Sequence, residues 1–289
     1  MSLEKLSACK VNLLLNILGK RPDGFHELET LMHPVRLCDQ LSFSETAGGI
    51  QLSCSDPSLP ADSSNLVYKA AAAFLAQTGI KQGVKIHLEK KIPMAAGLGG
   101  GSGNAATTLL GLNELFGKPF SIEQLHPIAA SLGSDIPFFL QTRPALATGR
   151  GEKIQSLESF PSLEGKAFFL IHPGFGIATA WAYKELARFP EALNGKAGRA
   201  EGLAKSLRKA DLRSAAKEFY NSLEAPALEK YPILGLYQEF LRAEGALATL
   251  MSGSGSTTFA IASSLEEAHG WEEKFRAKFG RCWISTVAV

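Results

Sequence analysis

The chain has 289 residues, of which 45% are hydrophobic and 20% are charged, values typical of a folded globular protein with about two domains. Lys and Arg number 30 and Asp and Glu 28, and the net charge of +2 comes without a long block of one sign, which argues against a nucleic-acid partner. Because the N-terminus lacks a signal-peptide pattern and no uncharged apolar run reaches the roughly 18 residues of a membrane span, we expect a cytoplasmic protein without a membrane partner.

The first half of the chain is expected to begin with strands and to continue with helices. Alternating apolar residues and turn signals predict strands over Ala8–Leu18 and Glu27–Pro34, and a hairpin of Leu41–Ser44 with Ile50–Cys54. Capping residues and glycine stops then predict, in order, a helix over Leu66–Gln77, a strand over Val84–Lys90, helices over about Asn104–Phe116 and from Ser121 to near Gly133, and a hairpin over Ala145–Ser156.

The second half is expected to form a separate α+β layer after a linker at Phe160–Gly165. The predicted elements are a strand over Lys166–Ile171, helices near Thr179–Phe189, Glu201–Lys209, Leu212–Leu223 and Ile233–Glu244, strands over Ala248–Met251 and Thr258–Ala262, a helix containing Leu265–Phe275, and a strand over Cys282–Val287. Without the additional helices, this order is that of a ferredoxin-like split βαβ layer.

The strongest local pattern is a glycine-rich segment between a predicted strand and a predicted helix, Pro93-Met94-Ala95-Ala96-Gly97-Leu98-Gly99-Gly100-Gly101-Ser102-Gly103. Glycines let backbone N–H groups point toward a ligand without hindrance from Cβ, and the start of a helix adds free amides and the positive end of its dipole. The segment therefore predicts a phosphate-binding loop. The alternative is a turn whose glycines only allow the strand and the helix to pack closely.

Two common phosphate loops fit this segment poorly. A Walker A loop requires G-x-x-x-x-G-K-[ST], and no lysine stands at the required place. The dinucleotide pattern G-x-G-x-x-A is matched at Gly101–Ala106, with Glu123 at about the expected distance for a ribose contact. That pattern should follow directly on a strand, however, and Pro93 with several loop residues intervenes. Dinucleotide binding is the less favoured alternative.

Two charged residues lie in apolar segments. Lys10 stands with Asn12 in the strand Ala8–Leu18, and Asp135 stands in the segment Leu132–Phe139. A charge in such surroundings needs a partner. Each residue alone is compatible with a structural ion pair as well as with a catalytic role.

Taken together, the Lys10 strand, the glycine-rich segment, the Asp135 segment and Leu250–Thr257 resemble in order and spacing the motifs of the GHMP kinases, the superfamily of galactokinase and of homoserine, mevalonate and phosphomevalonate kinases. The resemblance covers nearly the whole chain. It implies an α+β fold of two domains, a ribosomal-protein-S5-like domain over residues 1–157 and a ferredoxin-like domain over residues 158–289.

A further pattern narrows the resemblance. Lys10–Leu15 followed by Gly19–Leu28, with the element Asp23-Gly24-Phe25-His26, is similar to the branch that phosphorylates the 2-hydroxyl of 4-diphosphocytidyl-2-C-methyl-D-erythritol (CDP-methylerythritol) in non-mevalonate isoprenoid synthesis. This branch implies ATP as phosphoryl donor and Mg²⁺ as counterion, without implying the ligands of the metal or an oligomeric state. A homoserine or mevalonate-type kinase and a non-catalytic nucleotide-binding protein are the alternatives.

The resemblance also implies roles for particular residues. Lys10 and Asp135 are the candidate catalytic residues, with Asp135 as base for the alcohol proton and Lys10 as its electrostatic partner. The glycine-rich segment and Asn65 are expected at the nucleotide. The residues expected at the acceptor, where aromatic rings would stack on cytosine, are Asn12, Phe25, His26, Thr179 and Tyr183. Tyr183 is also compatible with a core position on an amphipathic helix.

Overall fold

The computed structural model describes residues 2–193, 195–209 and 211–289, which form two compact units. The first unit contains the residues up to Cys9, Leu37–Pro93 and Gly99–Thr142, and the second contains Lys10–Arg36, Met94–Leu98 and Arg143–Val289. Strands β1 (Ser2–Lys20) and β2 (His26–Thr46) contribute residues to both units. The division into domains between residues 157 and 158 stays a prediction.

In the first unit, β4 (Gly83–Glu89) pairs with two strands. It runs antiparallel to the C-terminal end of β2 and parallel to β3 (Ile50–Cys54). The predicted hairpin of Leu41–Ser44 with Ile50–Cys54 is therefore wrong, because β4 is the hydrogen-bonding partner of both segments. Parallel strands need a long crossover connection, which helix α1 (Leu66–Thr78) provides between β3 and β4.

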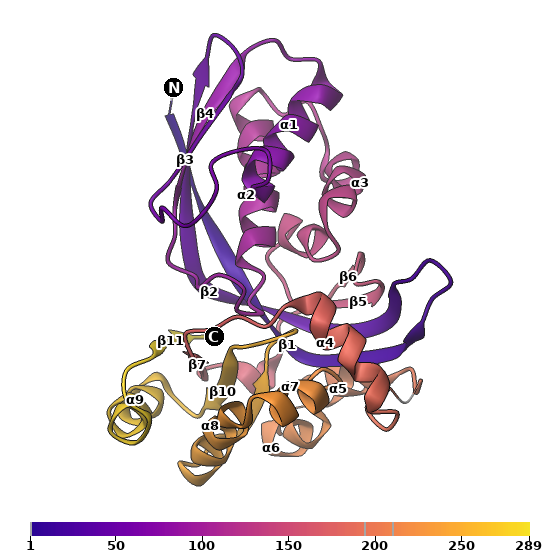
Figure 1. Ribbon diagram of the computed structural model, residues 1–289, viewed down its shortest axis with the longest axis vertical. Helices are drawn as coiled ribbons and strands as arrows, with labels where there is room; N and C mark the ends of the chain where they lie inside the picture. Colours follow the sequence, from indigo (N-terminus) through magenta and orange to yellow (C-terminus); the bar gives the residue numbers. More distant parts are fainter. Residues whose placement is uncertain (1, 194, 210) are drawn as a thin grey trace. The chain divides into compact units, whose positions relative to one another are not determined.

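Helices cover one side of these strands, as Figure 1 shows for α1, α2 (Gly100–Leu115) and α3 (Ile122–Leu132); the short 3-10 helix η1 (Ile136–Leu140) follows. Their apolar faces share a core that includes Phe43, Phe74 and Leu109. The capping box at Ser121 begins α3 as predicted. Helix α2, however, begins at Gly100 instead of Asn104, so the last residues of the glycine-rich segment are helical.

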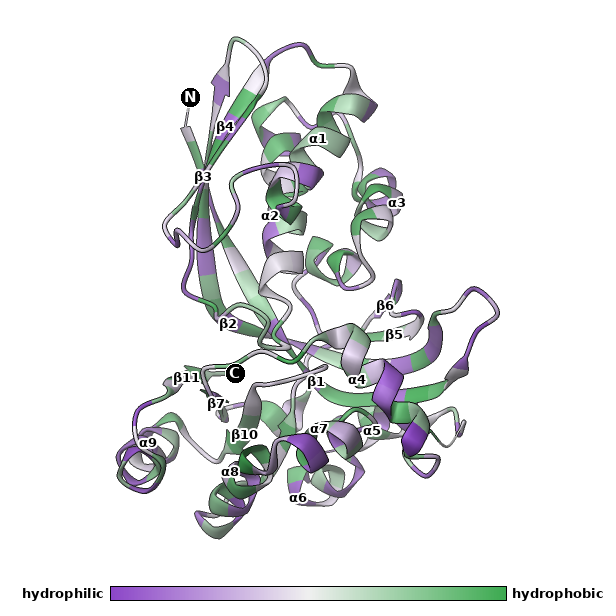
Figure 2. Cartoon of the chain, in the orientation of Figure 1, coloured by the Kyte–Doolittle hydropathy of each residue, from purple (hydrophilic) through white to green (hydrophobic). Residues whose placement is uncertain are grey.

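The second unit contains an antiparallel sheet in the order β11-β7-β10-β9, formed by β7 (Ala167–His172), β9 (Ala248–Met251), β10 (Thr258–Ala262) and β11 (Trp283–Ala288). This order confirms the predicted split βαβ arrangement. Helices α8 (Pro232–Ala243) and α9 (Leu265–Phe279) pack on it, with Phe240 and Trp271 in the same core as Phe169. Figure 2 shows the amphipathic colouring of α8, hydrophobic and hydrophilic residues on one helix.

Three further strands complete the second unit. β5 (Ala145–Gly149) pairs with β2 and with β6 (Lys153–Ser156), which confirms the predicted hairpin, and β8 (Tyr220–Asn221) runs parallel to β1. The predicted helix over Leu212–Leu223 is wrong in its second half, because the chain leaves the helix before β8. The remaining elements are η2 (Pro161–Leu163), α4 (Thr179–Glu185), η3 (Leu186–Arg188), α5 (Arg199–Leu207), α6 (Leu212–Ala215), η4 (Ala216–Glu218) and α7 (Glu224–Lys230).

Candidate active site

Lys10 lies in the middle of β1 and is only 2% exposed. Its ammonium group donates to Asn12 Oδ1 at 2.5 Å and to the carbonyl of Gly97 at 2.8 Å. The Asn12 amide donates in turn to Thr30 Oγ1 of β2 at 2.8 Å, which directs the Asn12 oxygen toward Lys10. The second unit therefore holds a buried positive charge against the backbone of the glycine-rich segment.

Gly97 joins this charge to a second loop. Its carbonyl also accepts a hydrogen bond from Ser252 Oγ at 2.9 Å. The φ angle of Gly97 is +74°, and a Cβ at this position would lie 2.0 Å from the carbonyl oxygen of Ser252. Only glycine fits here without displacement of one of the two loops.

Two site residues in the second unit, Asn221 and Ser252, were not placed by the sequence analysis. Asn221 projects from β8 and donates to the carbonyls of Met251 and Gly253 at 2.8 and 2.7 Å, which fixes the turn that carries Ser252. The motif Leu250–Thr257 had indicated the turn. The contribution of Asn221 depends on the pairing of β8 with β1 and has no local sequence signal.

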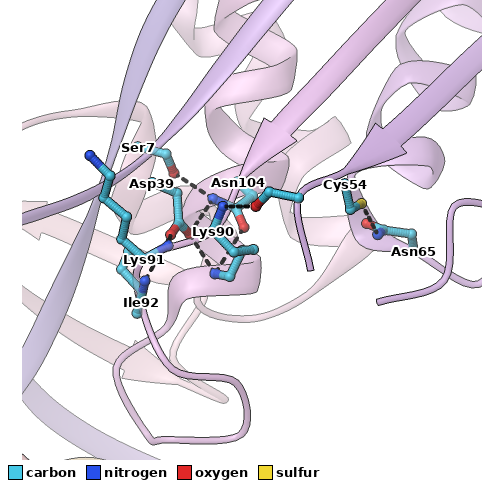
Figure 3. A network of polar contacts seen from close by, with 9 residues as sticks. Ser7, Asp39, Cys54, Asn65, Lys90, Lys91, Ile92 and Asn104 are labelled. Atoms are coloured by element: carbon cyan, nitrogen blue, oxygen red, sulfur yellow. Dashed lines mark hydrogen bonds and ion pairs between the residues drawn. The ribbon is translucent and has the colours of Figure 1, made fainter. Parts of the chain in front are cut away.

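In the first unit, Asp39 fixes the backbone around the start of α2 (Figure 3). Its carboxylate is completely buried and accepts four hydrogen bonds, from Lys90 Nζ at 2.5 Å, from the backbone N–H groups of Lys91 at 2.7 Å and Ile92 at 2.9 Å, and from Asn104 Nδ2 at 2.9 Å. Lys91 and Ile92 precede the glycine-rich segment, and Asn104 follows it in α2. One carboxylate therefore holds the residues on both sides of the segment.

The start of α2 has the properties of an anion site. Gly99 occupies the N-cap position and has no side chain to cap the helix. The first backbone N–H groups of a helix have no acceptor within it, and they carry the positive end of the helix dipole. The half-buried Ser102 lies in this first turn. Both features fit a phosphate group.

Asn65, shown beside Cys54 in Figure 3, is the N-cap residue of α1. Its side-chain oxygen accepts from Val67 N at 2.9 Å, and its amide nitrogen donates to the carbonyl of Pro60 at 2.7 Å. The side chain is therefore engaged at both of its polar atoms in fixing the start of the helix.

Asp135 belongs to the first unit and directly precedes η1. Ile136, Phe138 and Leu140 are buried, so the short helix is anchored in the core while Asp135 itself stays half-buried. This arrangement holds a carboxylate at a fixed place without enclosing it.

The predicted acceptor residues lie in the second unit. The rings of His26 and Tyr183 lie 5.0 Å apart, and Phe25 is 52% exposed. Burial lowers the pKa of His26 below its ordinary value, and the nearby Lys20 adds to this effect, so both favour the neutral imidazole. Thr179, at the start of α4, has its hydroxyl 2.9 Å from Ser254 Oγ.

Each of the two units therefore contains some of the predicted site residues. The second brings Lys10 and Asn12 together with residues 94–98 of the glycine-rich segment, and it brings His26 to Tyr183. The first contains Pro93, Asn65, Asp135 and residues 99–103.

Neither a metal cluster nor a membrane helix is found in the part of the chain that the structure describes. Across residues 2–193, 195–209 and 211–289, no group of three or more His, Cys, Asp or Glu side chains is arranged to hold a metal ion. In the same residues, no helix combines the length and the apolar character needed to cross a membrane.

Comparison with known proteins identifies the family. Residues 65–143 match the model of the GHMP kinases N terminal domain, and residues 202–281 match that of the GHMP kinases C terminal domain. A relative from Pelotomaculum thermopropionicum, named 4-diphosphocytidyl-2-C-methyl-D-erythritol kinase, is 40% identical over 277 residues, which cover 96% of this chain and 94% of the relative.

Solved structures agree with this result. A crystal structure of a 4-(cytidine 5'-diphospho)-2C-methyl-D-erythritol kinase matches with a TM-score of 0.82 and 36% identity, and the match covers 99% of this chain and 100% of the other. A homoserine kinase from Cytophaga hutchinsonii has a TM-score of 0.79 at 20% identity, covering 100% of this chain and 95% of the other, which is a likeness of fold alone. The chain belongs to the GHMP kinases and, among them, to the 4-diphosphocytidyl-2-C-methyl-D-erythritol kinase family.

Proposed function

We propose that the protein transfers the γ-phosphoryl group of ATP to the 2-hydroxyl of CDP-methylerythritol. A bond forms between the acceptor oxygen and the γ-phosphorus, the bond from that phosphorus to the β,γ-bridging oxygen breaks, and ADP leaves. The observation that carries the choice of acceptor is the pairing of His26 with Tyr183 beside the exposed Phe25, because neutral aromatic surfaces of this kind bind a planar base. The relative from Pelotomaculum thermopropionicum and the matched crystal structure at 36% identity both carry the name of this kinase, which supports the same choice.

The glycine-rich segment, Pro93–Gly103, is proposed to bind the triphosphate of ATP. The free amides at the start of α2 are suited to phosphate oxygens, and the ammonium of Lys10 adds a positive charge at the carbonyl of Gly97. Because both polar atoms of the Asn65 side chain serve the start of α1, we expect Asn65 to shape the nucleotide pocket through that helix.

The residues present fit a Mg²⁺ ion that is bound mainly by nucleotide phosphates. Such an ion keeps several waters and needs only one or two protein oxygens, so a dedicated cluster of carboxylates is not required. The hydroxyl of Ser102, in the first turn of α2, is the proposed protein oxygen. When bound, the ion neutralises charge on the phosphates.

Asp135 is proposed to accept the proton of the 2-hydroxyl, and Lys10 to stabilise negative charge during transfer. Phosphoryl transfer depends mainly on positioning and on neutralising charge, with the alcohol proton passing to a nearby base. The anchoring of Asp135 by η1 and the two hydrogen bonds from Lys10 to Asn12 and Gly97 fix the directions of both charged groups, which supports these roles.

Phe25, His26 and Tyr183 are proposed to bind the cytosine ring, with Thr179 and Asn12 near the methylerythritol end. Asn12 orients Lys10 through its amide oxygen, so we expect its effect on the acceptor to be partly indirect. Most acceptor affinity then comes from the nucleotide end, remote from the reacting hydroxyl.

The test compares ADP release with CDP-methylerythritol, homoserine and mevalonate, each supplied alone, for the wild type and two variants. Tyr183→Ala should raise the KM for CDP-methylerythritol about fivefold to thirtyfold, since an aromatic contact contributes about 1 to 2 kcal/mol, and should leave the KM for ATP unchanged. Tyr183→Phe keeps the ring and is the matched control. Turnover of homoserine or mevalonate in place of CDP-methylerythritol would refute the proposed acceptor.

A further inference from the structure

The turn between β5 and β6 lies beside the proposed cytosine site of the second unit. Leu28 of β2 pairs with Gly149 at the end of β5, so the next residue, Arg150, emerges opposite the segment that carries Phe25 and His26. The backbone N–H of Arg150 donates to Glu152 Oε2 at 2.7 Å, and Gly149 and Gly151 have φ angles of +75° and +104°. The turn is therefore fixed by the Glu152 carboxylate and by the pairing of β5 with β2.

From this turn, the Arg150 side chain lies over the ring of Phe25. Its guanidinium carbon lies 4.6 Å from the centre of the Phe25 ring, in the geometry of a cation–π contact. Phe25 still exposes half of its surface. One face of the ring is therefore backed by a cation while the remainder stays open to a ligand.

Arg21, Asp23 and Glu27 are the charged residues of the loop near this contact. The neighbouring Arg21 forms ion pairs with Asp23 at 3.1 Å and Glu27 at 2.5 Å, so one cation neutralises part of the charge of two carboxylates. Arg150 is also near enough to Asp23 to attract its carboxylate. The Arg150 guanidinium lies against an aromatic face, a contact that does not consume its N–H donors. A guanidinium has five donors in a planar fork that matches phosphate oxygens.

We propose that Arg150 is a specificity-determining residue of the acceptor site, which backs Phe25 against the base and presents a fixed positive charge to the diphosphate of the acceptor. This inference rests on the proposed function. It adds a contact that distinguishes a nucleoside diphosphate acceptor from a small uncharged or zwitterionic alcohol, because only the former offers a base to stack and a diphosphate to neutralise.

The experiment measures KM for CDP-methylerythritol and for ATP, and inhibition by CDP and by cytidine, in Arg150→Gln and Arg150→Lys. Lys153→Gln is the matched control, because it removes an exposed positive charge from the adjacent strand β6. We expect Arg150→Gln to raise the KM for CDP-methylerythritol about threefold to tenfold at low salt, with a smaller effect at high salt, and to weaken CDP more than cytidine. Arg150→Lys should recover only part of the loss, since it restores the charge without the planar fork.

Four results would count against the assignment. If Arg150→Gln and Lys153→Gln give the same KM for CDP-methylerythritol, or if CDP and cytidine weaken equally, Arg150 does not contact the diphosphate. If the KM for ATP rises in step with that for CDP-methylerythritol, the change is not specific to the acceptor. If the wild type fails to phosphorylate CDP-methylerythritol at all, the proposed function fails first and this assignment with it, a result that the wild-type assay separates from the other three.

Discussion

Replacing His33 should remove the part of the acid-induced loss of stability that arises from the burial of its imidazole. His33 lies on β2, is 7% exposed, and packs against the rings of Phe160 and Phe168. Its Nδ1 lies 2.8 Å from the carbonyl of Pro34, which accepts a hydrogen bond when that nitrogen carries the proton. Burial, only partly offset by this bond, lowers the pKa of His33 to about 4.

The sign of the effect follows from where the proton binds first. As the pH falls below about 6.5, the ordinary pKa of histidine, the unfolded chain takes up a proton at residue 33 while the folded protein does not until about pH 4. The unfolded state is therefore favoured progressively across this window. At about 1.4 kcal/mol per pH unit, the free energy of unfolding falls by roughly 3 kcal/mol between pH 7 and pH 4 through this residue alone.

The assay is urea unfolding followed by tryptophan fluorescence from pH 4.5 to 7.5 in the wild type and in His33→Asn. Asparagine keeps a donor near the position of Nδ1 and does not titrate, so its packing cost should be the same at every pH. The difference in unfolding free energy between the two proteins should shrink as the pH falls. His269→Asn, at an exposed position of α9, is the control for the loss of a histidine. A difference between wild type and His33→Asn that stays constant with pH would refute the reasoning.

The other predictions concern the glycine-rich segment and the catalytic residues. Asp135→Asn should lower kcat about 10²- to 10⁴-fold with little change in the KM for ATP, and near wild-type turnover would remove Asp135 from the mechanism. Gly97→Ala should raise the KM for ATP about tenfold or more, because the new Cβ would collide with the Ser252 carbonyl, and an unchanged KM would show that the loop position does not matter for ATP. Asp39→Asn should cost about 3 to 5 kcal/mol of unfolding free energy by leaving the Lys90 ammonium buried without its carboxylate. Adding Lys90→Met should recover part of this cost, and strictly additive losses in urea unfolding would contradict the pairing.

Local signals in the sequence predicted most elements but not the partners of the strands. The alternation over Ile50–Cys54 identifies a strand, and Gly48 and Gly49 suggest a hairpin. Nothing in that segment shows that β4, some thirty residues later, pairs with both β2 and β3. The strand in the segment Leu212–Leu223 was missed for the same reason. Asn221 belongs to a strand only because it pairs in parallel with β1. Helix α2 starts at Gly100 despite the poor helix propensity of glycine, at a place where an added Cβ would lie only 3.0 Å from Ile92 Cγ2, so the close approach of the two segments favours glycine there.

The residues of the candidate site also divide into those with a local signal in the sequence and those that only the fold brings into place. The glycine-rich segment and Lys10 are visible in the sequence because they break an apolar or helical pattern. Asp39 could have been found by the rule that drew attention to Asp135, that a carboxylate among apolar residues needs partners. Thr30 and Asn221, in contrast, act on segments distant in the sequence: Thr30 accepts a hydrogen bond from Asn12 of β1, and Asn221 donates one to the turn at Gly253. Only the fold brings these side chains to their partners.

The central claim is tested most directly by identifying the product of the purified protein incubated with ATP, Mg²⁺ and CDP-methylerythritol, by phosphorus NMR. The account predicts one new phosphomonoester on the 2-hydroxyl, formed in equal amount with ADP, and none with Asp135→Asn on the same time scale. ADP formed without any phosphorylated CDP-methylerythritol, or phosphorylation at a different hydroxyl, would contradict it.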